Sequence, residues 1–192
     1  MLLKVRLICG SILIILAISL DSAHASYRST LHDWTRSGKG YAFETLGAKL
    51  IWNATMLSAE ILNAQNDILI KKGLRPYSNG VEQKKITGLR FFVSLYTPKE
   101  LKDFSLEENS TWKLLLHNNG SEIQPTKIEQ VTITPTEKYF YPYLNRWSRA
   151  YLIEFPITEA DLGRNPELVL RSIVAESRLK WKVSRSLRYD QD

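Results

Sequence analysis

The sequence predicts a mainly β domain, an antiparallel β-sandwich that is immunoglobulin-like or a partly closed barrel, with about seven strands. Two observations favour this fold class. Short segments in which apolar and polar residues alternate recur along the chain, as in strands that bury one face. Turn-rich or charged loops join these segments, and a single segment shows a clear helical pattern. Because no repeat or shift in composition divides them, residues 26–192 are expected to form one domain.

The first predicted strand lies in "FETLGAKLIWNATM" (43–56), in which Leu50, Trp52 and Met56 share one face and Asn53 lies on the other. The later strand segments are "ITGLRFFVSLYTP" (86–98), "TWKLLLH" (111–117), "KIEQVTIT" (127–134), "AYLIEFPI" (150–157), "ELVLRSIVA" (167–175) and "RLKWKV" (178–183). The turn sequence Asn118–Gly120 accepts positive φ angles and is expected to join "TWKLLLH" to "KIEQVTIT" as a hairpin.

One α-helix is predicted after the first strand, in "SAEILNAQNDILIKKG". Ser58 suits the N-cap position, and Gly73 suits the left-handed residue that ends many helices. Its apolar stripe consists of Ile61, Leu62, Ile68 and Leu69. We expect this helix to cover an edge or an open end of the sandwich.

Residues 1–25 have the features of a secretory signal peptide. Lys4 and Arg6 precede the apolar run Leu7–Leu20, and an A-x-A motif ends at Ala25, after which cleavage is expected. The alternative is a retained membrane anchor, although the run is shorter than the ~20 residues that span a bilayer. The leader predicts a protein exported to the periplasm or outer envelope of a bacterium, with no transmembrane span after processing.

Composition limits the chemistry and the partners of the mature chain. The single cysteine, Cys9, lies in the leader, so the mature domain is expected to have no disulfide and no cysteine ligand. The full chain has a net charge of +6, and removal of Lys4, Arg6 and Asp21 with the leader leaves 6 − 2 + 1 = +5, which favours weak contact with anionic surfaces. Nucleic acid is not expected as a partner of an exported protein.

The two ends of the mature chain are expected to pack loosely. Residues 26–41 are polar and carry two glycines, which predicts a loop or loosely docked arm anchored by Trp34. Residues 184–192 form a basic tail that we expect to be disordered. Before the tail, Lys180 and Lys182 alternate with apolar residues. This alternation fits either an edge strand protected by lysines or a positive strip for an anionic lipid or polymer.

The segment "YFYPYLNRWSRAYLIEFP" is dense in aromatic residues. Its second half continues as a core strand, whereas Pro142 prevents regular pairing in residues 139–147, which we call the aromatic corner. Rings there either plug the end of the sandwich, with an arginine stacked on Trp147, or stay exposed as a platform for a sugar or a partner protein. The candidate binding residues are Tyr139, Tyr141, Tyr143, Arg146, Trp147 and Arg149.

No catalytic residue, metal site or cofactor is predicted. His32 and His117 are the histidines of the mature chain, and neither accompanies a G-x-S-x-G serine. Metal-ligand spacings and phosphate-binding loops are also missing from the sequence. These observations argue against an enzyme.

Four segments carry a resemblance to a known group of proteins: "DWTRSGKGY", "FFVSLYTP", "YPYLNRWSRAYLIEFP" and "SRLKW". Together they resemble uncharacterised exported proteins of bacteria, often predicted lipoproteins. The resemblance implies an envelope location and a helix followed by strands, and it supplies no site residue. The chain departs from the group in lacking a lipidation cysteine.

The sequence therefore predicts a non-enzymatic envelope protein with a binding or scaffolding role, whose partner is another envelope protein or a polysaccharide. One alternative is a carbohydrate-binding or carbohydrate-active protein that uses the aromatic corner. A further alternative is a peripheral membrane protein that uses the basic C-terminus.

Overall fold

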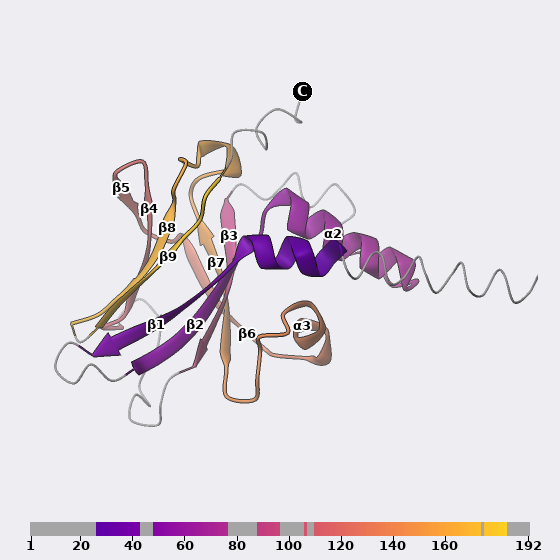
Figure 1. The fold of residues 1–192 in the computed structure, drawn as a ribbon, viewed down its shortest axis with the longest axis horizontal. Coiled ribbons are helices and arrows are strands. Elements are labelled where there is room, and N and C mark those ends of the chain that lie inside the picture. The colour runs from indigo at the N-terminus through magenta and orange to yellow at the C-terminus, as the bar shows by residue number, and fades with distance from the viewer. Residues whose placement is uncertain are drawn as a thin grey trace, which may run out of the picture.

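In the part of the chain that the structure describes, nine antiparallel strands form the body of the molecule (Figure 1). The computed structural model describes residues 26–42, 48–76, 88–96, 106, 110–173 and 175–183. The strands are β1 (Thr35–Ala42), β2 (Ala48–Met56), β3 (Leu89–Tyr96), β4 (Lys113–Asn118), β5 (Ser121–Ile123), β6 (Lys127–Val131), β7 (Arg149–Phe155), β8 (Glu167–Arg171) and β9 (Ala175–Lys180). The helices are α2 (Ala59–Lys71), α3 (Pro135–Phe140) and the 3₁₀ helix η3 (Glu159–Asp161), and residues 26–34 are also helical.

The strands are hydrogen-bonded in the order β5-β4-β8-β9-β1-β2-β3-β7-β6 and form two layers. One layer contains β5, β4, β8 and β9, and the other contains β1, β2, β3, β7 and β6. Within the described residues, β1 and β9 connect the layers through two residue pairs, Tyr41 with Glu176 and Ala42 with Ala175. The predicted mainly β sandwich is confirmed, with β1 and β5 as strands that the sequence did not indicate.

The core of the sandwich fills the space between the two layers. Leu50, Trp52 and Met56 of β2 are buried, as their alternation predicted. Leu179 of β9 faces these side chains from the other layer. Trp181, just after β9, packs edge-to-face on Phe91, with ring centroids 5.4 Å apart. This core is the main source of stability, because burial of apolar surface drives folding.

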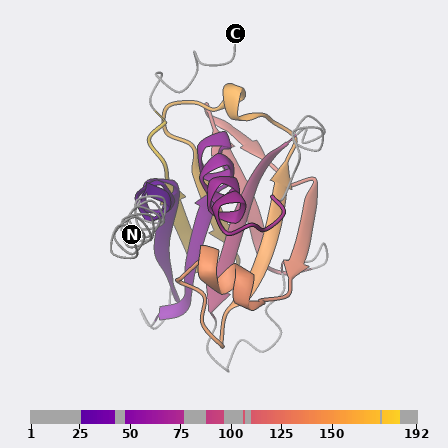
Figure 2. The same cartoon turned by 90° about the vertical axis from the view of Figure 1, so that its right-hand side faces the viewer.

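Helices cover the outer face of the five-stranded layer. Figure 2 shows residues 26–34, α2 and α3 lying over this layer. The helix α2 begins at the predicted cap, where Ser58 Oγ accepts a hydrogen bond from the Ile61 amide, and Gly73 has the expected positive φ of 68°. The expectation that this helix covers an edge or open end was wrong. Because it covers a face, alternate residues of β2 and β3 that point away from the sandwich, such as Thr55 and Phe92, are buried too.

The N-terminal segment differs from the loop or loose arm expected for residues 26–41. Residues 26–34 are helical, and their buried Tyr27, Leu31 and Trp34 have the spacing of one helical face. The next residues form β1, which pairs with β2 along its length, and this places Gly38 opposite Trp52. A Cβ at Gly38 would come within 2.8 Å of the Leu179 side chain, so its glycine serves close packing between the layers rather than a flexible turn.

The predicted hairpin is partly correct. Asn119 and Gly120 form the turn, with φ angles of 51° and 82°, but they join β4 to the short β5. Residues 127–131 pair with β7 instead. The chain leaves β5 at Pro125, which cannot donate a backbone hydrogen bond, and the Thr126 amide then donates to Glu154 of β7.

The last strand, β9, lies between β8 and β1, so the prediction of an edge strand was wrong. Within the described ranges, no helix is both long and apolar enough to cross a membrane. The signal-peptide and basic-tail predictions concern residues 1–25 and 184–192, which lie outside the described residues.

Candidate functional site

The aromatic corner is part of the connection between the neighbouring strands β6 and β7. The chain leaves β6, forms α3, turns through residues 141–148 and re-enters the sheet as β7. α3 begins with a capping box in which the Thr134 and Glu137 side chains satisfy each other's backbone amides, and Pro135 occupies the first turn. Local sequence therefore specifies this short helix. It was not predicted, because the alternation in residues 127–134 indicated a strand up to the residue before α3.

Phe140 fixes the end of α3 to the helical layer. It is 2 % exposed, and its carbonyl accepts a 2.7 Å hydrogen bond from the Tyr27 hydroxyl. The Tyr27 and Phe140 rings also meet edge-to-face, with centroids 5.5 Å apart. The start of the described chain thus holds the corner in place.

Tyr141 fixes the corner to the sheet. Its ring stacks on Phe92 of β3, with centroids 3.8 Å apart and ring planes 5° from parallel. Its hydroxyl accepts a 3.1 Å hydrogen bond from the Gln65 amide of α2, which also donates to the Tyr27 hydroxyl. Because Phe92 lies on the outer face, the corner packs against that face, and the expected plug at the end of the sandwich was wrong.

Tyr143 is the second inward-pointing tyrosine. Its hydroxyl is 2.7 Å from Thr55 Oγ1, which is in turn 2.7 Å from Thr35 Oγ1, so three hydroxyl groups form a chain across β2 and β1. Burial raises the pKa of Tyr143 well above its ordinary value, although the hydrogen bond with Thr55 opposes the shift. The side chain therefore acts here as a neutral phenol.

Trp147 points the other way and is 61 % exposed. Its backbone amide donates a 2.8 Å hydrogen bond to Asn145 Oδ1, and the Asn145 amide donates to Ser148 Oγ. These bonds fix the loop that carries the indole outward. The Arg146 guanidinium lies 4.6 Å from the Trp147 ring centroid, which confirms the predicted stacking of an arginine on this ring.

A cavity of about 510 Å³ opens beside this loop. It lies between the two ends of the β6–β7 connection and is lined by Gln130, Val131, Thr132, Ile133, Lys138, Asn145, Arg146, Ser148, Arg149 and Ala150. Among these lining residues, three are cations and none is acidic. Its volume falls in the ~300–1,000 Å³ range of ligand pockets.

The six candidate residues thus divide by environment. Tyr141 and Tyr143 point into the protein and position the corner, whereas Tyr139 is 38 % exposed, with Lys72 Nζ 4.6 Å from its ring centroid. Arg146 and Arg149 line the cavity, and Trp147 stacks on Arg146. Lys138 was not among the predicted site residues, because its approach to the later loop depends on the turn through α3.

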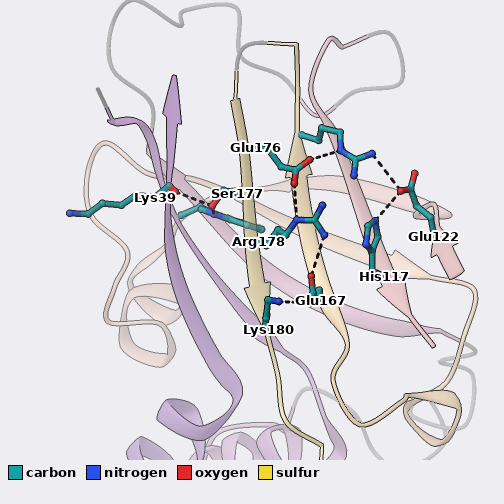
Figure 3. Close-up of polar contacts among 10 residues, drawn as sticks. Lys39, His117, Glu122, Glu167, Glu176, Ser177, Arg178 and Lys180 are labelled. Atoms are coloured by element: carbon teal, nitrogen blue, oxygen red, sulfur yellow. Dashed lines mark hydrogen bonds and ion pairs between the residues drawn. The ribbon is translucent and has the colours of Figure 1, made fainter. Parts of the chain in front are cut away.

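The basic residues of β9 lie on the exposed side of the four-stranded layer, where acids pair with them (Figure 3). Lys180 Nζ lies 2.7 Å from Glu167, and Arg178 contacts both Glu167 and Glu176. The series continues through Arg171, Glu122 and His117. Because acids pair with Arg178 and Lys180, β9 itself does not form a positive strip in the described part of the chain.

The same ion pairs shift the titration of their members. The hydrogen bond from Lys180 lowers the pKa of Glu167, and the hydrogen bond from Arg171 lowers that of Glu176. The hydrogen bond to Glu176 raises the pKa of Arg178. These charges stabilise one another across β8 and β9 and are not arranged as an acid–base pair for catalysis.

Among the residues described, no group of three or more His, Cys, Asp and Glu side chains could hold a metal ion. His32 is exposed at the surface beside Asp33, and His117 pairs with Glu122 at the end of β4. No family model, curated protein or solved structure matches this chain.

Proposed function

We propose that this chain is an exported, non-enzymatic protein of the bacterial cell envelope that binds a polysaccharide at the aromatic corner. The observation that carries the proposal is the exposed Trp147 indole, which lies against Arg146, a residue that lines a 510 Å³ cavity. An exposed tryptophan costs solvation free energy that a ligand can recover, and tryptophan, tyrosine and arginine supply most of the binding energy in recognition sites.

The way in which the corner is held supports the same role. Phe140 and Tyr141 are buried, and their contacts with α2, β3 and residues 26–34 leave the neighbouring loop little freedom. A site held rigidly before the ligand arrives loses less conformational entropy on binding. The export part of the proposal is supported by the leader features of residues 1–25.

Binding can be tested by co-sedimentation with purified peptidoglycan and with extracted envelope polysaccharide. Trp147→Ala is expected to weaken binding at least about tenfold, as hot-spot truncations do. Ile173→Ala is the matched control, because Ile173 is 86 % exposed but lies in the β8–β9 connection. The proposal fails if the wild-type protein binds neither material, or if Trp147→Ala binds as well as Ile173→Ala.

Export is tested separately by cell fractionation and N-terminal sequencing. The expected mature protein lies in the envelope fraction and begins at Ser26. A chain that keeps residues 1–25 and stays in the membrane would support the retained anchor, and a cytoplasmic chain would contradict export altogether. This measurement is independent of the binding assay, so the two parts of the proposal can fail separately.

A further inference from the structure

The charged residues that line the cavity are all positive. Lys138, Arg146 and Arg149 reach it from α3, the corner loop and the start of β7. Within the described ranges, no carboxylate forms an ion pair with Lys138 or Arg146. This contrasts with the face formed by β8 and β9, where Arg178 and Lys180 both pair with acids.

The stacking of Arg146 on Trp147 limits how the indole can contact a ligand. With the Arg146 guanidinium 4.6 Å from its centroid, one face of the indole is already covered. A neutral sugar that stacks on that face would have to displace the guanidinium. An acidic sugar could instead accept hydrogen bonds from the guanidinium while its ring contacts the remaining indole surface.

The other groups in the lining suit the same type of ligand. Gln130, Thr132, Asn145 and Ser148 are polar, and Asn145 and Ser148 already hydrogen-bond within the loop, so their positions are fixed. Cations that converge on a cavity of this size favour carboxylate or phosphate groups, whose charge they neutralise.

From these observations we infer that the ligand is an anionic saccharide that carries carboxylate or phosphate groups, and that Lys138 and Arg146 contact its charge. The inference rests on the proposed function and sharpens it. The cations then select for an anionic ligand, and the Trp147 ring supplies apolar contact beside them. Binding should therefore weaken as salt concentration rises, because salt screens exposed charges.

The test is a titration of the full mature chain with three polymers: polygalacturonate, a phosphomannan and dextran. The first carries carboxylates, the second carries phosphates, and the third is neutral. At least one anionic polymer is expected to bind, dextran is not, and a difference between the two anionic polymers identifies the group that is recognised. Lys138→Gln and Arg146→Gln should each weaken binding about tenfold, since each removes a charge-assisted contact.

Lys182→Gln is the control, because it removes one exposed positive charge that follows β9 and lies outside the cavity lining. Binding of dextran that Trp147→Ala abolishes and Arg146→Gln leaves intact would overturn the inference and preserve the proposed function. An equal loss in Lys182→Gln would indicate non-specific attraction and would overturn the inference. If the wild-type protein binds none of the three polymers but still binds extracted envelope polysaccharide, the inference is also overturned. If it does not bind the extracted polysaccharide either, the proposed function is overturned as well.

Discussion

The Tyr141 ring stacks on the Phe92 ring with 3.8 Å between their centroids, and this contact joins the aromatic corner to the sheet. Phe92 belongs to β3 and lies 141 − 92 = 49 positions earlier in the chain. Through this stack, the position of the corner depends on the sheet as well as on its local sequence. The exposed loop that follows is therefore held by a buried aromatic contact.

Replacing Tyr141 should test this anchor. Tyr141→Ala is expected to lower the free energy of unfolding by about 3 kcal/mol, because it removes a buried ring and leaves a cavity. Tyr141→Phe keeps the stack and loses the hydrogen bond from Gln65, which should cost only about 1 kcal/mol. Urea unfolding measures both. Tyr139→Ala, at a partly exposed ring in α3, is the control, and an equal loss in that variant would contradict the anchor role.

The hydrogen bond between Trp52 Nε1 and Ser177 Oγ, 2.8 Å long, should connect the two layers energetically. Ser177→Ala leaves the buried indole N–H without its partner and is expected to cost about 1–3 kcal/mol. In a Trp52→Phe background the same substitution should cost less, because the donor is already gone. A double-mutant cycle in urea measures the difference, and strictly additive losses would show that the bond contributes nothing.

Acid should weaken the four-stranded layer. The pKa values of Glu167 and Glu176 are lower in the folded state than in an unfolded chain, where glutamate titrates near ~4.3. Their ion pairs therefore contribute stability above that value, and the contribution is lost as pH falls through the folded-state pKa values. Thermal unfolding from pH 7 to pH 3 should show a smaller decline in Glu167→Gln than in the wild type. Parallel declines would contradict this assignment.

High pH should lower the stability of the fold through ionisation of Tyr143. Its pKa is raised by burial, so the folded state holds the phenol proton more tightly than an unfolded chain, whose tyrosines titrate near ~10. Stability is therefore expected to fall as pH rises above about 10. Tyr143→Phe should reduce this alkaline loss, while costing stability at neutral pH through the lost contact with Thr55. Absorbance titration of tyrosine at high pH provides the check, and an early-titrating Tyr143 would contradict its burial.

The strands that the sequence predicted correctly are those with strong alternation, such as Leu50 to Met56 in β2. β1 was missed because its residues are polar or glycine, and its pairing with β2 depends on Gly38 allowing Trp52 and Leu179 to approach closely. The helix over residues 26–34 did leave a signal, the helical spacing of Tyr27, Leu31 and Trp34.

The candidate site was only partly predictable for a related reason. Tyr143 and Trp147 lie four positions apart in similar sequence surroundings. The Tyr143 hydroxyl nevertheless bonds Thr55 inside the protein, whereas the Trp147 ring is exposed. Contacts with β2 and β3 decide this difference, and they come from sequence far from the corner. Arginine stacking on Trp147 was predictable because Arg146 is its neighbour, whereas the approach of Lys138 depends on α3.

The five tryptophans of the chain offer the most direct measurement of whether the corner binds an anionic saccharide. Trp34, Trp52, Trp112 and Trp181 are at most 6 % exposed, so acrylamide quenching of fluorescence reports chiefly on Trp147. Saturating polygalacturonate or phosphomannan should protect the fluorescence from acrylamide, and dextran should not. Unchanged quenching while an anionic polymer is demonstrably bound would place the ligand elsewhere and contradict the central claim.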